Sequence, residues 1–534
     1  MAKDIVDVLI IGAGASSAAA AWSLSDTKMR ILCLEQGDWM NPADYPSTNK
    51  NWEVMLNPDY NQSPNVRRNE ADYPINEDDS AISVANFNGV GGGTILYSGH
   101  FPRLKPSDFK ARTLDGVGDD WPINYYALEP FFAQNDRNMG VSGLAGDPAI
   151  PYHEPPLPPV PIGRMGEVMG KGFNKLGWHW WPSDSAIITE DYEGREKCIN
   201  LGPCNYGCAQ GAKSSVDIAY WPMNQRLGVE LKTRCRVREI TVDKNDMATG
   251  AIYFDEEGVE HHQRAEVVIM ACNGVGTPRL LLNSKSARFP DGLANRSGLV
   301  GKNLMFHPWG FVQGIFEDQL ESHLGPMGTC MLSQEFYETD PNRDFMRGYT
   351  LQITRGQPPA ATAVNQTLRG NIPWGADHHA GFEKYAGGSV NMNICCEDLP
   401  EECNTVTLDP TLTDSDGIPA PKITYRLSEN SERMMQHGVS KATEALQAAG
   451  AFQIDTHGHT RGTGWHLLGT ARMGNDPEKS VVNSWGRSHD VKNLFIIDGS
   501  IFVTAGAVNP TTTIQALALY IADTMKKNLA NLFD

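Results

Sequence analysis

The chain has 534 residues, enough for more than one structural unit and a large buried core. Its formal net charge of −19 at pH 7 excludes the basic surface on which general nucleic-acid binding depends. Ten cysteines in a chain of this length do not make a small disulfide scaffold, and no apolar run is long enough to span a bilayer. The first residues lead directly into a predicted strand. We therefore expect a cytoplasmic protein, or a periplasmic one that a partner subunit carries across the membrane.

The N-terminal segment carries a strand, a glycine-rich turn, a helix and a second strand. Residues 6–11 are an apolar, β-branched run typical of a buried parallel strand, residues 18–24 favour a helix, and residues 30–34 form the second strand. Gly12 permits the tight turn, and Gly14 lets the backbone approach a pyrophosphate. This order of elements is the dinucleotide-binding fingerprint in its required context.

The same fingerprint predicts four further contacts. Ala15 and Ser16 would present the backbone N–H groups of the helix N-terminus to a phosphate. Ser17 replaces the third glycine and is small enough for the helix to pack closely on the strand. Glu35, at the end of the second strand, would accept hydrogen bonds from a ribose diol. The alternative interpretation is a glycine-rich turn that holds no ligand.

A second glycine-rich loop spans residues 88–99. Four glycines in five positions indicate that the backbone closely approaches a flat ligand or a phosphate. A flexible linker is the alternative, but such linkers do not run directly into Thr-Ile-Leu-Tyr. The residues predicted to contact the ligand here are Gly91, Gly92, Gly93, Thr94, Tyr97 and Ser98.

A second strand, glycine turn and helix of nucleotide-binding character follows at residues 266–282. Residues from about 310 to 450 lack this alternation of strand, glycine turn and helix. They mix short strands and turns with a long predicted loop at residues 357–388, and we interpret them as a substrate-facing sheet.

Three cysteines, Cys198, Cys204 and Cys208, lie within eleven residues. Thiolates at this spacing are candidate ligands of an iron–sulfur cluster, and a three-iron cluster is the form that three ligands could satisfy. A structural disulfide, such as Cys198 with Cys204, or buried free thiols are the alternatives.

The C-terminal stretch brings an imidazole and an amide toward one place. His466 precedes a Gly-Thr turn, an apolar strand ends in Asp498-Gly499, and Asn509-Pro510 opens a helix. The alternatives are that His466 is a buried histidine with satisfied hydrogen bonds, and that Asn509 is a helix N-cap ahead of Pro510.

These segments together resemble the glucose–methanol–choline (GMC) oxidoreductases, and within them the large flavoprotein subunits of bacterial dehydrogenases that act on glucose, gluconate, fructose or glycosides. The resemblance implies a two-domain α/β fold, with a Rossmann-like FAD-binding domain and a substrate domain on a mainly antiparallel sheet. The matching segments are residues 12–35, 89–103, 268–282, 299–308 and 466–513. The expected FAD-binding domain is 1–125, 210–309 and 455–534, and the expected substrate domain is 126–209 and 310–454.

The resemblance also implies how FAD is held. Val237 falls where a strand contacts the adenine, and Asp498 and Gly499 fall near the pyrophosphate or the ribityl chain, with Pro510 and Thr511 beside them. Some members attach FAD covalently through a histidine just after the glycine loop. Here residues 94–97 contain no histidine and the first is His100, so we expect non-covalent FAD. In several members cysteines at this spacing carry a three-iron cluster, whereas relatives without a cluster carry similar cysteines.

The resemblance finally implies an activity. His466 would be the base and Asn509 a hydrogen-bond donor in the oxidation of a CH–OH group of a sugar, glycoside or related polyol, with FAD taking the hydride. A small subunit and a cytochrome electron acceptor are the candidate partners. One alternative is an oxidase or dehydrogenase of aryl, lignin-type alcohols. Trp374 and the tryptophans at 178–181 would suit either aromatic rings or sugar faces. Another is a non-catalytic flavin electron-transfer subunit, which needs no base.

Overall fold

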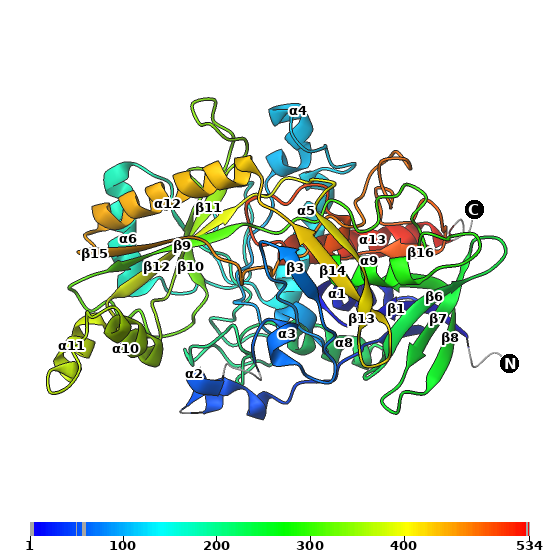
Figure 1. Cartoon of the computed structure of the whole chain (residues 1–534), viewed down its shortest axis with the longest axis horizontal. Coiled ribbons are helices and arrows are strands. Elements are labelled where there is room, and N and C mark those ends of the chain that lie inside the picture. The colour runs from blue at the N-terminus through cyan, green and yellow to red at the C-terminus, as the bar shows by residue number, and fades with distance from the viewer. Residues whose placement is uncertain (1–4, 50, 56–59, 530–531, 533–534) are drawn as a thin grey trace.

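The computed structural model describes residues 5–49, 51–55, 60–529 and 532 and has two halves that lie side by side (Figure 1). The half at the right of Figure 1 is built on a largely parallel sheet, and the half at the left on an antiparallel sheet. This arrangement confirms the predicted α/β fold with a Rossmann-like sheet and an antiparallel substrate-domain sheet.

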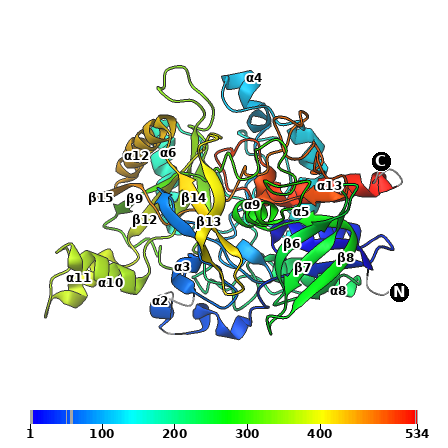
Figure 2. The same cartoon turned by 45° about the vertical axis from the view of Figure 1, so that its right-hand side comes forward.

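The largely parallel sheet has the strand order β5-β2-β1-β8-β7-β6, and β16 also pairs with β8. In β1, Leu9 lies between Leu32 of β2 and Val268 of β8, and all three side chains are buried. A strand enclosed in this way needs an apolar run, which residues 6–11 supply. Figure 2 brings the antiparallel extension β6-β7-β8 forward. The strands are β1 (Ile5–Ile11), β2 (Ile31–Leu34), β5 (Glu230–Lys232), β6 (Arg236–Val242), β7 (Ala248–Phe254), β8 (Glu260–Met270) and β16 (Leu494–Ile496).

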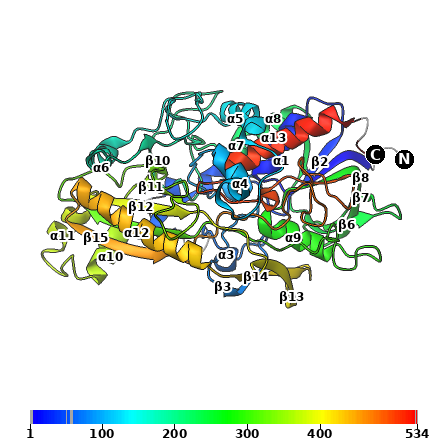
Figure 3. The same cartoon turned by 90° about the horizontal axis from the view of Figure 1, so that it is seen from above.

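Helix α13 (Thr511–Lys527) packs against both α1 (Ala15–Leu24) and α5 (Tyr125–Met139), as the view from above shows (Figure 3). The alanines at 18–21 of α1 are buried, and their small side chains let the helices approach closely. In the described part of the chain, no helix has the length and apolar character needed to cross a membrane. The other helices of this half are α4 (Ala111–Asp115), α7 (Val216–Ala219), α8 (Trp221–Arg226) and α9 (Asn273–Asn283).

The antiparallel sheet has the strand order β15-β9-β12-β11-β10-β4. Helix α12 (Glu429–Ala449) packs on it and on α6 (Gly163–Leu176) (Figure 3). Ser428 caps α12, because its Oγ accepts a hydrogen bond from the Ser431 N–H at 3.1 Å. The strands are β4 (Trp181–Pro182), β9 (Trp309–Ile315), β10 (Thr329–Ser333), β11 (Tyr349–Thr354), β12 (Ser389–Cys396) and β15 (Gln453–His459).

Residues 357–388 were predicted as a long loop, and this prediction is wrong. The segment contains α10 (Pro359–Leu368) and α11 (His378–Tyr385), at the lower left of Figure 1. The carboxylate of Glu53 accepts hydrogen bonds from the first N–H groups of α10, those of Ala360 at 3.0 Å and Ala361 at 2.9 Å. Because this cap lies more than 300 positions away, the local sequence does not reveal it.

A third, small sheet has the order β13-β14-β3 and lies beside α9, between the two halves in Figure 1. Its strands, together with two short helices that precede the second glycine loop, complete the described elements of regular α and β structure. They are β3 (Asn76–Ser80), β13 (Thr405–Thr413), β14 (Pro419–Tyr425), α2 (Trp52–Met55) and α3 (Pro64–Arg67).

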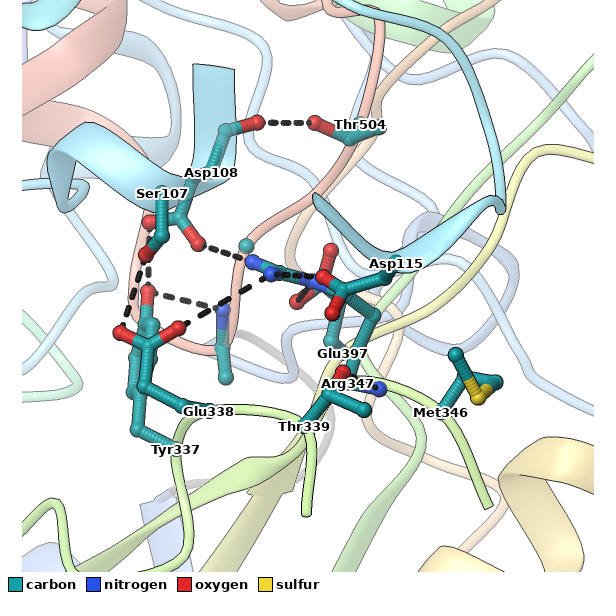
Figure 4. A network of polar contacts seen from close by, with 12 residues as sticks. Ser107, Asp108, Asp115, Tyr337, Glu338, Thr339, Met346, Arg347, Glu397 and Thr504 are labelled. Atoms are coloured by element: carbon teal, nitrogen blue, oxygen red, sulfur yellow. Dashed lines mark hydrogen bonds and ion pairs between the residues drawn. The ribbon is translucent and has the colours of Figure 1, made fainter. Parts of the chain in front are cut away.

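A buried ionic network joins the two halves (Figure 4). Arg347, just before β11, is fully buried and donates to Glu397 Oε2 at 2.9 Å, to Asp115 Oδ2 at 2.8 Å and to Asp108 Oδ1. The Tyr337 hydroxyl donates to Asp108 Oδ2 at 2.7 Å. The predicted domain boundaries stay a prediction, but this network fixes how the segment around Asp108 meets the antiparallel sheet.

Candidate active site

A cavity of about 500 Å³ is lined by elements of both halves. One wall is formed by the glycine turn after β1, the second glycine loop and the N-terminus of α13. The other wall is formed by side chains of β9, β11 and β12. A cavity of this size, with polar groups converging from separate elements, is the expected location of a ligand site.

The glycine turn adopts the conformation that the fingerprint requires. Gly12 has φ +94°, and a Cβ there would meet the Ala271 carbonyl oxygen at 2.6 Å. Gly92 of the second loop has φ +51°, and its Cβ would meet the Gly14 Cα atom at 2.9 Å. The two loops therefore approach each other so closely that only glycine fits at Gly92.

The helix N-termini α1 and α13 both open on this cavity, at Ala15 and Ser16 and at Pro510 and Thr511. Neither has a side-chain N-cap hydrogen bond or an acidic residue in its first turn. Backbone N–H groups and the positive ends of two helix dipoles thus face one space, which suits phosphate groups.

Glu35 lines the cavity while its carboxylate also holds the turn. Its Oε2 accepts from the Ala13 N–H at 2.7 Å and its Oε1 from the Gly37 N–H at 2.9 Å. Burial raises the pKa of Glu35, an effect that these backbone N–H groups oppose.

Most of the predicted cofactor contacts line the cavity, but two do not. Ser17 is buried behind the turn, where its hydroxyl donates to the Gly14 carbonyl at 2.9 Å. Gly91, with φ +109°, shapes the loop against Ile95 and also lies outside the cavity wall. The predicted contacts on the wall are Gly12, Gly14, Ala15, Ser16, Glu35, Gly92, Gly93, Thr94, Tyr97, Ser98, Val237, Asp498, Gly499, Pro510 and Thr511.

Asp498 has a structural task at this wall. Its Oδ2 accepts from the Asn273 N–H at 3.1 Å and from the Thr277 hydroxyl, and its Oδ1 accepts from the Ser500 N–H at 2.8 Å. The carboxylate therefore ties the loop after β16 to the N-terminus of α9.

His466 and Asn509 lie together on the cavity wall, with Asn509 Nδ2 3.4 Å from His466 Nε2. His466 Nδ1 lies 2.9 Å from Nδ1 of His307. Asn509 Oδ1 lies 2.8 Å from His100 Nδ1 and accepts from Gln352 Nε2 at 2.8 Å. The structure thus brings the two predicted catalytic residues together and surrounds them with three further polar side chains.

The imidazoles at this site are held neutral by burial. Burial lowers the pKa of His466 well below the ordinary histidine value, and the neighbouring His307 and His100 lower it further. Burial also lowers the pKa of His307 and of His100 to about 4. A neutral imidazole is the form that can accept a proton, so His466 has the protonation state of a base at neutral pH.

The opposite wall carries amides, hydroxyls and indoles. Gln352 and Thr354 project from β11, opposite Asn393 and Asn391 of β12 in the strand register. Asn393 Nδ2 donates to the Thr354 hydroxyl at 2.9 Å. Trp309 and Trp465 also line the cavity, with ring centroids 5.5 Å apart, whereas Trp374 and the tryptophans at 178–181 are outside its wall.

The sequence did not single out His307, His100 and Gln352 as neighbours of the predicted base. His307 lies in the extended segment 299–308, and His100 was considered only as a point of flavin attachment. Gln352 carries no motif. The signal that could have found His307 is the His-Pro pair that ends this segment.

The predicted iron–sulfur cluster is not supported. In residues 5–49, 51–55, 60–529 and 532, no three His, Cys, Asp or Glu side chains form a group that could hold a metal ion. The cysteine sulfurs instead have separate partners: the Cys198 Sγ accepts from the Asn200 N–H at 3.4 Å and the Cys208 Sγ from the Lys213 N–H at 3.5 Å. Burial raises the pKa of the Cys204 thiol to about 11.

The residues present fit FAD. The fingerprint turn, the glycine cradle at Gly92 and two helix N-termini match a pyrophosphate, and the acid at Glu35 lies where a ribose is expected. His466 and Asn509 lie on the wall of the same cavity, so a flavin held by these residues would share that cavity with the predicted base.

Comparison with known proteins agrees with this geometry. Residues 6–309 and 400–518 match two models described as GMC oxidoreductase. The chain is 40% identical to a 2-methyl-1,2-propanediol dehydrogenase of Mycolicibacterium austroafricanum over 99% of this chain and 97% of that protein. It is 29% identical to the fructose dehydrogenase large subunit of Gluconobacter japonicus over 98% of each.

Solved structures share the fold. The pyridoxine 4-oxidase from Mesorbium loti matches with a TM-score of 0.64 at 15% identity, over 98% of this chain and 99% of that one. A formate oxidase of Aspergillus oryzae RIB40 matches with a TM-score of 0.64 at 14% identity, over 99% and 100%. The family prediction is therefore confirmed, whereas the sugar-dehydrogenase subgroup is represented at lower identity than the diol dehydrogenase. The chain belongs to the GMC oxidoreductase family, FAD-dependent enzymes that oxidise an alcohol group.

Proposed function

We propose that this enzyme is a dehydrogenase of a small vicinal diol or polyol, with His466 as the base and Asn509 as the donor to the substrate oxygen. The observation that carries the proposal is the 40% identity, over nearly the whole of both chains, to a 2-methyl-1,2-propanediol dehydrogenase. The pairing of His466 with Asn509 on one cavity wall supports it, because alcohol oxidation needs both groups at one oxygen.

The chain's own residues remove the proton from the alcohol. The neutral His466 accepts the hydroxyl proton at Nε2, the nitrogen that faces Asn509. Asn509 Nδ2 donates to the same oxygen and holds the carbon in place as the C–O bond acquires double-bond character. When bound, FAD supplies the acceptor for the hydride that leaves the carbon.

We expect FAD to be held without a covalent bond. Residues 94–97, just after the glycine loop, contain no histidine. Acid or heat precipitation should release all the flavin into the supernatant. Flavin retained in the washed precipitate would contradict this assignment.

A sugar is the second candidate substrate. The fructose dehydrogenase large subunit covers 98% of the chain, and the amide-rich wall of Gln352, Asn391 and Asn393 offers donors and acceptors for several hydroxyls. Indoles that stack on sugar faces are also present at Trp309 and Trp465.

The test is anaerobic flavin reduction with matched substrates: 2-methyl-1,2-propanediol, 1,2-propanediol, 1-propanol, fructose, gluconate and benzyl alcohol. The proposal expects the diols to reduce the flavin at least about tenfold more efficiently than the mono-alcohol with the same carbon chain. Faster reduction by fructose or gluconate would favour a sugar, and faster reduction by benzyl alcohol an aryl-alcohol enzyme. No reduction by any alcohol, with FAD bound, would leave a flavin electron-transfer subunit.

The electron acceptor is part of the same proposal. The small subunit and the cytochrome stay predictions, and the arrangement of Cys198, Cys204 and Cys208 does not favour a cluster relay. We therefore expect a soluble acceptor to support full turnover of anaerobically purified protein that contains no iron. About three iron atoms per chain, lost together with turnover on chelation, would restore the cluster prediction.

A further inference from the structure

His307 and His466 share a hydrogen bond in which the direction is fixed by a third group. The Nε2 atom of His307 lies 2.9 Å from the Gly506 carbonyl oxygen. A carbonyl oxygen can only accept, so His307 Nε2 must carry a hydrogen and donate it. The other nitrogen of His307, Nδ1, lies 2.9 Å from Nδ1 of His466.

The neutral state of His307 sets the direction of this second bond. A neutral imidazole with a hydrogen on Nε2 has a lone pair on Nδ1. His307 is 1% exposed, and burial lowers its pKa to about 4, so a second proton is disfavoured at neutral pH. Nδ1 of His307 is therefore an acceptor, and the hydrogen between the two rings belongs to His466.

We infer that His307 is a positioning residue that fixes the proton of His466 on Nδ1, so that Nε2 presents a lone pair to the substrate hydroxyl. The inference rests on the proposed role of His466 as the base. An imidazole without such a partner distributes its proton between both nitrogens, and the tautomer with a hydrogen on Nε2 cannot accept a proton there.

The arrangement on the far side of His466 agrees with this direction. Asn509 Oδ1 has two neighbours at 2.8 Å, Gln352 Nε2, which donates, and His100 Nδ1. With its oxygen held by these groups, Asn509 directs its Nδ2 hydrogens toward His466 Nε2, 3.4 Å away. A donor faces Nε2, which requires a lone pair on that atom.

The backbone holds His307 and its acceptor rigidly. The Phe306 N–H donates to the buried Asp398 at 3.1 Å, and Pro308 follows the histidine. Gly506 has φ +67°, and a Cβ there would meet Leu104 Cδ2 at 2.2 Å, so the carbonyl that orients His307 lies in a segment that only glycine permits.

A matched pair of variants tests the role in catalysis. His307→Asn keeps an acceptor near the position of Nδ1, whereas His307→Leu has a similar volume and no acceptor. We expect His307→Leu to slow flavin reduction at saturating diol about 100-fold, with little change in the diol dissociation constant and full FAD content. His307→Asn should stay within about tenfold of the unsubstituted enzyme. In Ser-His-Asp enzymes the wrong tautomer costs about 10⁴ in kcat, which sets the upper end of the scale. Equal losses in both variants would overturn the inference.

A neutron structure of the perdeuterated, FAD-bound protein at pH 8 tests the proton positions without any substitution. Deuterium on His307 Nε2 and on His466 Nδ1 is the expected result, and deuterium on His466 Nε2 overturns the inference even if the variants do not fold. Failure of the proposed function would look different. It would appear as a normal rate of flavin reduction in His466→Ala, whichever nitrogen of His466 carries the deuterium in the unsubstituted protein.

Discussion

The Nε2 atom of Gln352 lies 2.8 Å from the Oδ1 atom of Asn509, and the two side chains come from different halves of the molecule. Gln352 is on β11 of the antiparallel sheet, is 1% exposed, and accepts from the Thr329 hydroxyl at 3.3 Å through its Oε1. The half built on the antiparallel sheet therefore fixes the orientation of an amide that belongs to the half built on the parallel sheet.

This contact predicts the effect of Gln352→Leu. Without the Nε2 donor, the Asn509 amide loses one of the two neighbours of its oxygen, and we expect flavin reduction to slow about tenfold, the scale of one hydrogen bond. FAD content should be unchanged. Gln366→Leu is the matched control, because Gln366 on α10 is equally buried, is not among the residues that line the cavity, and accepts its hydrogen bond from Asn371 Nδ2 at 2.8 Å. Equal effects of the two substitutions on the rate of flavin reduction would show that Gln352 has no specific role in orienting Asn509.

His466→Ala should slow flavin reduction by alcohol about 10² to 10⁴-fold, the usual contribution of a general base. The apoprotein should still bind FAD, because the predicted contacts of the pyrophosphate lie on other segments of the cavity wall. Anaerobic stopped-flow spectroscopy of the flavin band measures the rate. His379→Ala, an exposed histidine in α11, is the control. Reduction within threefold of the unsubstituted enzyme would remove His466 from the role of base.

The pH dependence of flavin reduction follows from the lowered pKa of His466. The base is active when neutral. Burial, together with His307 and His100, lowers the pKa of His466 well below the ordinary histidine value of 6.5. The rate should thus be level from pH 8 down to 6.5 and fall only at lower pH. Stopped-flow rates at saturating alcohol across pH 5 to 9 provide the measurement. An acid limb centred above pH 6.5 would contradict this protonation state.

The two adjacent glycines Gly92 and Gly93 should respond differently to alanine. At Gly92 a Cβ would meet Gly14 at 2.9 Å and the backbone has φ +51°, so Gly92→Ala should destabilise the apoprotein by about 1–3 kcal/mol. Gly93 lines the cavity, and a Cβ added there would meet no other atom within 4 Å. Gly93→Ala should therefore leave the free energy of unfolding of the apoprotein unchanged and weaken FAD binding. Urea unfolding of the apoprotein and titration with flavin measure the two effects separately. A loss of apoprotein stability in both variants would contradict this prediction.

The cofactor side of the site could be predicted because its pattern is local. Gly12, Gly14 and Glu35 lie in one strand-turn-helix-strand unit, and the geometry of that unit is the same wherever its sequence occurs. The loop at Gly92 could be predicted for the same reason, since a run of glycines indicates close backbone approach.

The surroundings of the base could not be predicted, because they come from distant positions. His307 lies 159 positions from His466, Gln352 lies 157 from Asn509, and His100 lies 409 from Asn509. Which polar side chains meet across such long separations in the sequence depends on how the two sheets pack against each other. No rule of sequence spacing describes that packing. The cysteines show the converse case. The spacing of Cys198, Cys204 and Cys208 suggests a shared ligand, but the backbone N–H groups of Asn200 and Lys213 hydrogen-bond the sulfurs of Cys198 and Cys208 separately.

Arg347→Met should cost about 3–5 kcal/mol of the free energy of unfolding at pH 8. The substitution leaves Asp108 and Glu397, both fully buried, without the guanidinium that neutralises them (Figure 4). Arg433→Met is the control, because its i,i+4 pair with Glu429 is exposed and should contribute at most about 0.5 kcal/mol.

The same variant has a signed pH dependence. Burial raises the pKa of Glu397 to about 7 and raises that of Asp108, while Arg347 opposes both effects. In Arg347→Met the two pKa values rise further, so the folded state binds more protons than the unfolded state and its stability falls as pH increases. The deficit relative to the unsubstituted protein should therefore shrink between pH 8 and pH 6 in urea unfolding. A deficit below 1 kcal/mol, or one that is equal at both pH values, would show that these two carboxylates do not depend on this arginine.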